Sequence, residues 1–110
     1  MDVNVRDLNG GIAVIQLVGR LNMASAVHLR EAVTSIVDSG RTRVAIDMSG
    51  VDFLDSSGLG AIISALKTTR QAGGDLRIAA PTGQAKLVLQ LTNLDRILTA
   101  YDDAETAFNE

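Results

Sequence analysis

The first residues of the chain alternate between polar and apolar positions. Val3 and Val5 are separated by polar side chains, the turn sequence Asn9–Gly11 follows, and an apolar run extends from Ile12 to Val18. Alternation with a period of two is typical of a strand, and a glycine-containing turn between two such segments is typical of a hairpin. The pattern therefore predicts a β-hairpin at the start of the chain.

The next segment changes to the spacing of a helix. Between Ala24 and Asp38 apolar side chains recur every three or four residues, and Gly40 follows as a stop signal. Residues 44–48 then alternate as a strand, which joins a second helical segment through residues 49–57. That segment ends near Gly73 and Gly74, and its apolar face consists of Leu59, Ile62, Ile63 and Leu66. A helix, a strand and a second helix are predicted in that order.

Shorter elements are predicted in the last third of the chain. Residues Leu76 to Ala80 form a candidate strand before Pro81, and residues 84–92 a candidate third helix. A short last helix is expected from Asp102 to Phe108, with Asp102 or Asp103 as its cap. Strands that alternate with helices indicate an α/β fold, with a sheet that is mostly parallel after the hairpin.

The composition fits one small domain without export or membrane signals. A chain of 110 residues with 46% hydrophobic content is expected to form a single domain over residues 1–110. Its apolar run from Ile12 to Val18 is far shorter than the roughly 20 residues that cross a bilayer. The first ten residues lack the order of a signal peptide, and the absence of cysteine fits a reducing compartment. We expect a cytoplasmic protein without membrane insertion.

Charge and aromatic content argue against direct binding of nucleic acid. The formal net charge is −3, and the basic residues are scattered rather than gathered in a stripe. Only Phe53, Tyr101 and Phe108 are aromatic, so platforms for base stacking are nearly absent. Aliphatic side chains are expected to build the core.

The segment DFLDSSGLGAII, residues 52–63, raises the question of function. Asp55, Ser56 or Ser57 could cap a helix that starts here. Glycine at positions 58 and 60 would nevertheless cost about 0.5–1 kcal/mol each within a helix. We therefore expect bare backbone to be needed beside the serines, and we interpret both glycines as letting a partner approach closely.

An enzymatic use of these serines finds no support in the sequence. The nucleophile elbow of hydrolases, G-x-S-x-G, would need glycine where Asp55 stands. A serine nucleophile also needs a base, and the single histidine, His28, lies on the polar side of the first predicted helix. Neither of the common glycine-rich nucleotide motifs occurs, so no nucleotide cofactor is expected.

A phosphoaspartate site is a second chemical alternative. Asp47, Asp52 and Asp55 could hold magnesium beside a strand end. Receiver domains also use an acidic pair after the first strand and a late lysine, whereas here no lysine follows Lys86. We expect these aspartates to cap or solvate the loop, and we expect no metal site.

The serines remain as candidate phosphate acceptors. At the start of a helix, free N–H groups and the helix dipole favour an added anion, so a phosphate can be accommodated without unfolding. Phosphorylation adds about −1.5 to −2 charges, which would repel an acidic or apolar partner from that surface. From the residues alone an ordinary helix cap and a regulated acceptor both stay open.

The segment VAIDMSGVDFLDSSGLGAIISALK resembles the STAS family of anti-sigma-factor antagonists. It is preceded by GRLNMASAVHLREAV and followed by GGDLRIAAPTGQAKLVLQLTNLDRIL, so the resemblance spans nearly the whole chain. The resemblance implies a STAS fold, a mixed sheet of about four or five strands with helices packed on it. The D-S-S-G-L-G centre is specific in company with these flanking segments.

The resemblance also implies a regulatory role. In similar antagonists the second serine of the motif, which is Ser57 here, is phosphorylated by a serine kinase that is also the anti-sigma factor. The unphosphorylated form binds this kinase and frees the sigma factor, and a PP2C-type phosphatase restores the serine. ATP belongs to the partner, so the antagonist itself needs no cofactor and has no catalytic site.

The residues expected to contact the partner surround the switch. They are Asn22, Asp55, Ser56, Ser57, Gly58 and Leu59. Leu59 could instead be a core residue, and Asn22 stands where family members often carry an aspartate, which bears on the choice of partner. Two alternatives stay open: a STAS subunit of a membrane transporter assembly for lipid or anion transport, and a serine hydrolase or receiver-like phosphoenzyme.

Overall fold

The computed structural model describes residues 1–108 and contains one five-stranded sheet with the order β1-β2-β3-β4-β5. β1 runs antiparallel to β2, and each later pair of neighbours is parallel. The predicted α/β fold with a mixed sheet is confirmed. Its strands are β1 Asp2–Leu8, β2 Ile12–Leu21, β3 Arg43–Leu54, β4 Asp75–Ala79 and β5 Ala100–Tyr101.

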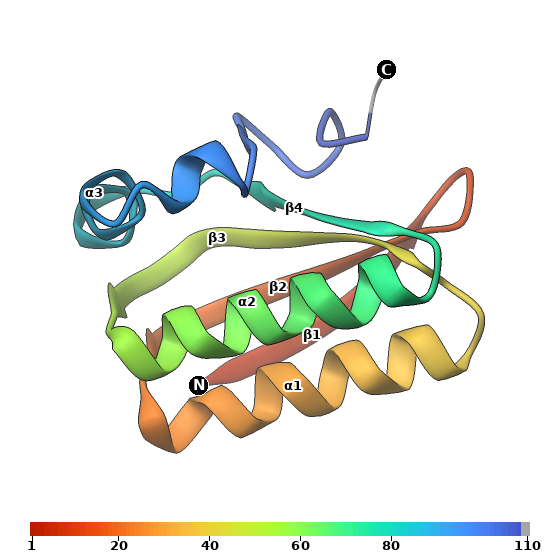
Figure 1. Cartoon of the computed structure of the whole chain (residues 1–110), viewed down its shortest axis with the longest axis horizontal. Helices are drawn as coiled ribbons and strands as arrows, with labels where there is room; N and C mark the ends of the chain where they lie inside the picture. The colour runs from red at the N-terminus through yellow and green to blue at the C-terminus, as the bar shows by residue number, and fades with distance from the viewer. Residues whose placement is uncertain (109–110) are drawn as a thin grey trace.

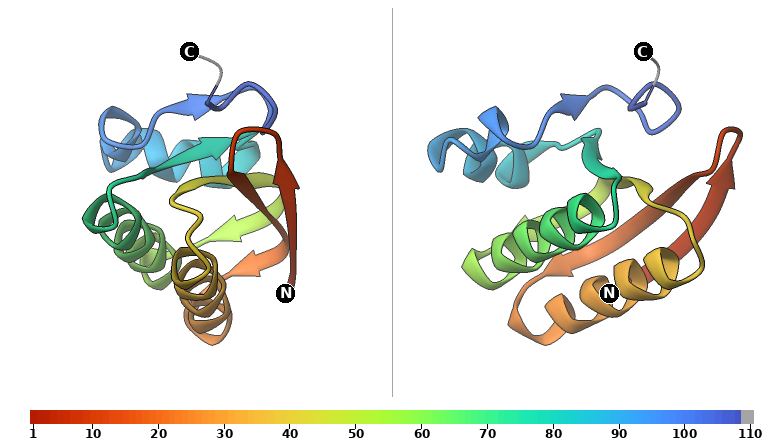
Figure 2. Two further views of the ribbon diagram at one scale, coloured as in Figure 1. Left: turned by 90° about the vertical axis from the view of Figure 1, so that its right-hand side faces the viewer. Right: turned by 45° about the vertical axis from the view of Figure 1, so that its right-hand side comes forward.

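Two long helices cover one face of the sheet. α1 (Met23–Asp38) and α2 (Ser56–Gln71) lie side by side against it (Figure 1). α3 (Gly83–Leu91) follows β4 and leads into a short 3-10 turn, η1 (Leu94–Arg96). The C-terminal segment lies on the opposite side of the sheet from α1 and α2 (Figure 2). The three longer helices agree with the predicted ranges to within about three residues.

The pleat of β3 sends side chains into two apolar clusters. Ile46 and Met48 are fully buried in the main core, which α1 and α2 share. Ala45 points to the other face, where it is buried in a second cluster with Ala104 and Phe108. Burial of both faces explains why the central strands read as nearly continuous apolar runs.

β2 and β3 are both longer than the sequence pattern predicted. β2 continues past Val18 to Leu21, and β3 continues through residues 49–54, which were expected to form a loop. The two extensions pair with each other, with register shifts after Gln16 and after Gly19. These register shifts interrupt the strict alternation of side chains along the strands, so the strands predicted from the sequence ended before the observed ones. The extensions position the starts of α1 and α2.

The predicted helix from Asp102 to Phe108 is wrong. These residues form successive turns, in which the Ala107 N–H donates to the Ala104 carbonyl at 3.3 Å. The Asp103 carboxylate accepts the Thr106 N–H at 2.9 Å, and such local bonds compete with helix formation. The sequence analysis also missed η1 and β5, since the two residues of β5 are too few to show a period.

Candidate functional site

Two helix starts meet at the carboxyl ends of neighbouring parallel strands. Leu21, the last residue of β2, pairs with Leu54, the last residue of β3. The Asp55 N–H donates to the Leu21 carbonyl at 3.3 Å, which joins the start of α2 to the end of β2. The starts of α1 and α2 therefore lie at the same edge of the sheet (Figure 1).

Asp55 caps α2. Its Oδ1 atom accepts the Gly58 N–H at 2.9 Å, so Ser56 and Ser57 are the first two residues inside the helix. Ser56 is exposed and Ser57 is half-buried, and among residues 1–108 neither hydroxyl has a hydrogen-bond partner. Because an aspartate serves as the cap, neither serine side chain is needed to start the helix.

Asn22 caps α1 through a capping box. Its Oδ1 atom accepts the N–H groups of Ala24 and Ser25 at 3.1 and 3.2 Å, and the Asn22 N–H donates to the Ser25 hydroxyl oxygen at 2.9 Å. That hydroxyl donates in turn to the Arg20 carbonyl at 2.6 Å. The uncharged Asn22 amide therefore caps α1 through the same kind of hydrogen bonds that an aspartate can accept at this position.

Gly58 is buried, and its lack of a side chain serves the chain's own packing. A Cβ atom at this position would overlap the Leu21 carbonyl oxygen and lie 2.8 Å from Leu54 Cδ1. The expectation that Gly58 lets a partner approach is therefore wrong, since the end of β2 already occupies that space. Gly60 differs, because the nearest atom to a Cβ built there is Arg30 Nη2 at 3.9 Å.

Leu59 is a core residue. Its side chain is only 9% exposed and belongs to the main core. Of the six residues expected to contact a partner, Gly58 and Leu59 thus lie beneath the surface, and the remaining four are half-buried or exposed. The four are Asn22, Asp55, Ser56 and Ser57.

Gln84 completes this edge, and the sequence analysis missed it. The Leu54 N–H donates to Gln84 Oε1 at 2.7 Å, and Gln84 Nε2 donates to the Leu54 carbonyl at 2.8 Å. β4 stops pairing with β3 at Asp47, so the Gln84 amide takes the place of a strand for the end of β3. No local pattern marks a glutamine for a contact across 30 residues.

Among the residues that the structure describes, neither Ser56 nor Ser57 is hydrogen-bonded to a histidine or a carboxylate. His28 is exposed and lines a surface hollow with Met1, Arg20 and Asn22. Asp47 accepts the Ser49 N–H at 2.9 Å, but both residues lie within β3, whereas a loop was expected from residue 49. Within residues 1–108, no group of three acidic or histidine side chains could hold a metal ion, and none of the helices is long and apolar enough to span a membrane.

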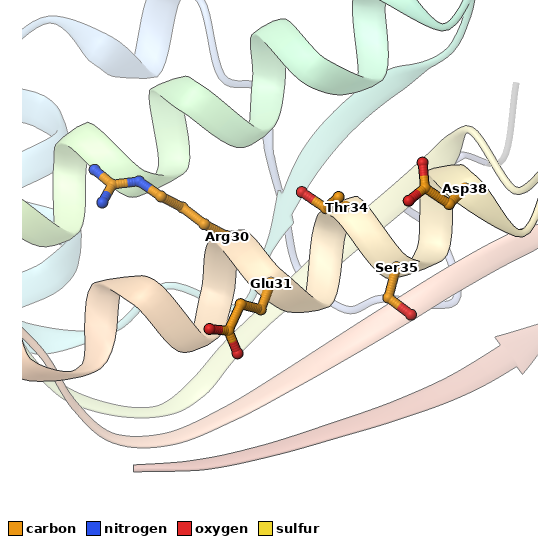
Figure 3. Close-up of a pocket in the computed structure, with 5 residues that line it drawn as sticks. All are labelled: Arg30, Glu31, Thr34, Ser35 and Asp38. Carbon is orange, nitrogen blue, oxygen red and sulfur yellow. The ribbon is translucent and has the colours of Figure 1, made fainter.

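Another surface hollow lies along α1. All five residues that line it are exposed and come from α1 (Figure 3). Arg30 extends from it toward α2, whereas Glu31 and Ser35 point the other way. None of the residues that line this hollow belongs to the motif around Ser57. The joined starts of α1 and α2, which carry that motif, are therefore the candidate functional site.

Comparison with known proteins agrees with this geometry. The STAS domain family matches residues 5–107. A Thermotoga maritima protein assigned as an anti-sigma factor antagonist is 35% identical over 91 residues, which cover 82% of this chain and 80% of that protein. The anti-sigma-F factor antagonist RsfB of Mycobacterium tuberculosis is 32% identical over 109 residues, covering 94% of this chain and 86% of RsfB.

A solved structure shares the whole fold. The crystal structure of a Thermotoga maritima protein assigned as an anti-sigma factor antagonist superposes on this chain with a TM-score of 0.88 at 27% identity. The match covers 97% of this chain and 92% of that protein. The chain belongs to the STAS domain family of anti-sigma factor antagonists.

Proposed function

We propose that this chain is a cytoplasmic anti-sigma factor antagonist that acts by binding and has no catalytic activity of its own. Its unphosphorylated form binds an anti-sigma factor that is also an ATP-dependent serine kinase, and this releases the sigma factor. Phosphorylation of Ser57 ends the binding, and a PP2C-type phosphatase restores it. The relatives named as anti-sigma factor antagonists support this role.

The observation that carries the proposal is the place of Ser57. Its hydroxyl has no hydrogen-bond partner among residues 1–108, in the first turn of a helix that Asp55 already caps. The kinase transfers the γ-phosphoryl group of ATP to Ser57 Oγ, the bond to the β-phosphate oxygen breaks, and the hydroxyl proton leaves to solvent. Modification therefore breaks no hydrogen bond within residues 1–108.

The contact surface consists of Asn22, Asp55, Ser56 and Ser57, with Gly58 and Leu59 as buried support. Met23, directly after the α1 cap, adds an apolar side chain that is 78% exposed. Exposed methionine suits a surface that binds partners, because its flexible thioether adapts to irregular contacts. A phosphate beside it would bring charge into an otherwise weakly charged contact.

The fold should tolerate the phosphate while the partner does not. The first N–H groups of α2 point toward the modification, and the helix dipole stabilises negative charge there. The charge of about −1.5 to −2 adds to that of Asp55 on the same surface. Repulsion of the partner, rather than unfolding, is therefore the proposed cause of release.

Phosphorylation by the cognate kinase tests the assignment of the acceptor. With ATP we expect one phosphoryl group on Ser57, none on Ser57→Ala, and unchanged incorporation on the matched control Ser56→Ala. Peptide mass spectrometry locates the group. Phosphate found on Ser56 would reject the assignment.

Binding of acceptor variants tests the electrostatic cause. Ser57→Asp should weaken kinase binding more than tenfold, about 1.4 kcal/mol, in calorimetric titration, and Ser57→Asn, equal in size but neutral, should bind better. Equal weakening by both would assign the effect to shape. Capture from native lysate with unmodified chain separates the two family roles, because a membrane transporter recovered instead of a kinase would favour the transporter alternative.

A further inference from the structure

Arg30 lies on α1 with its guanidinium against α2. Its Nη2 atom is 3.9 Å from the position that a Cβ would take at Gly60, and Figure 3 shows the side chain extended toward α2. Among residues 1–108, Arg30 makes no ion pair, whereas Arg6, Arg41 and Arg70 each pair with a carboxylate. A cation is thus held beside α2 without a counter-ion.

The contact at Gly60 brings this cation near the acceptor serine. Gly60 follows Ser57 by three residues, and side chains at that spacing on a helix are neighbours about 5–6 Å apart. Because Gly60 has no side chain, nothing on α2 at that position separates the guanidinium from Ser57. The Arg30 side chain is long and exposed, so its guanidinium is free to change rotamer.

We infer that Arg30, with the first turn of α2, forms an intramolecular binding site for the phosphomonoester on Ser57. The inference rests on the proposed function, in which Ser57 is phosphorylated. The planar guanidinium donates two parallel hydrogen bonds to phosphate oxygens, and the free N–H groups of the helix start donate from the other side. The ion pair bridges α1 and α2 across the proposed contact surface.

The inferred site gives phosphorylation a second effect on partner binding, besides repulsion by the phosphate. In the unmodified chain the Arg30 guanidinium is exposed beside the contact surface and can meet a partner. After phosphorylation the same group is engaged within the chain. The modification thus adds a negative charge at Ser57 and withdraws a positive one from the partner.

The charges around the phosphate determine what a titration will report. Asp55 caps the same helix and Asp52 lies near the end of β3, and both carboxylates raise the second pKa of the phosphate. From α1, Arg30 lowers that pKa, while Glu31 points away from α2 (Figure 3). Removing Arg30 alone should therefore raise the phosphate pKa.

The test uses the full chain with phosphoserine incorporated genetically at position 57, so that no kinase is needed. We expect Arg30→Gln to raise the second pKa of the phosphate, followed by ³¹P NMR, by about 0.5–1 unit, the effect of opposite charges about 4 Å apart in water. Arg30→Lys should keep part of the lowering of the phosphate pKa, because lysine retains the positive charge but lacks the planar guanidinium that makes two parallel hydrogen bonds. Arg96→Gln, which alters an exposed arginine of η1, is the matched control and should leave the pKa unchanged.

A second measurement needs no substitution at position 30. In the phosphorylated wild-type chain, the Arg30 Nε–H resonance should titrate with the same pKa as the phosphate. Equal phosphate pKa values in Arg30→Gln and Arg96→Gln would overturn the inference. So would an Arg30 Nε–H resonance whose chemical shift does not change as the phosphate titrates. Neither result depends on a kinase, so failure of the site and failure of the proposed function are distinguishable.

Discussion

Replacement of Gly58 by alanine tests how the candidate site is built. The added Cβ would overlap the Leu21 carbonyl oxygen and lie 2.8 Å from Leu54 Cδ1 and 2.9 Å from Leu21 Cγ. The backbone oxygen cannot move aside without disturbing its bond from the Asp55 N–H and the pairing of β2 with β3. The start of α2 must therefore shift away from the sheet.

The magnitude follows from two opposing terms. Overpacking of a well-packed site costs about 1–3 kcal/mol, and alanine gains about 0.5–1 kcal/mol over glycine in a helix. We expect Gly58→Ala to lower the free energy of unfolding by about 1 kcal/mol, the difference between the middle values of these two ranges. In a domain of this size each kcal/mol lowers the melting temperature by roughly 4–8 °C.

Gly60→Ala is the matched control. The same substitution two residues later meets only the flexible Arg30 side chain at 3.9 Å, so the helix gain of about 0.5–1 kcal/mol should appear as stabilisation. Urea unfolding followed by circular dichroism measures both variants, and opposite signs are expected. If Gly58→Ala stabilises the chain as much as Gly60→Ala does, the close approach of α2 to Leu21 is not a constraint and this account of the site is refuted.

Three further predictions concern contacts around the site and the C-terminal segment. Asn22→Ala should lower the free energy of unfolding by about 0.5–2 kcal/mol through loss of the α1 cap, whereas Asn22→Asp keeps the cap; equal melting curves for the two variants would contradict the capping role. Gln84→Ala should lower the free energy of unfolding by about 1–3 kcal/mol, because both hydrogen bonds to the part-buried Leu54 backbone are lost. Hydrogen exchange should accelerate at the Leu54 N–H, and protection equal to that of the wild type would contradict this role of Gln84. The hydrogen bond from Arg6 is the main cause that lowers the pKa of Glu105, so Arg6→Gln should raise that pKa in an NMR titration. Because the folded-state pKa is depressed, the stabilising effect of this pair is present above the unfolded-state pKa and is lost as pH falls through the folded-state pKa. An unchanged pKa in the variant would show that the pair does not form in solution.

The sequence by itself determined the elements whose signals are local. Period-two alternation identified β1 and the first part of β3, an apolar run identified β2, and helical spacing identified α1 and α2, because side-chain direction depends only on neighbouring residues. The strand β4 and the helix α3 were also predicted from their local sequence. The motif around Ser57 identified the candidate acceptor, and the absence of an adjacent base in the sequence argued against an enzyme. These conclusions needed no knowledge of how the elements pack.

Only the tertiary structure decided which residue has which role within the site. Asp55, rather than either serine, caps α2, and Gly58 is required by the carbonyl of Leu21, a residue at the end of a strand far earlier in the chain. The pairing of Gln84 with Leu54 likewise joins distant segments. The packing of Ala107 and Phe108 on the sheet, in a segment of turns, was likewise not predicted. Such contacts form only when the sheet brings strand ends together, and a local pattern carries no record of them.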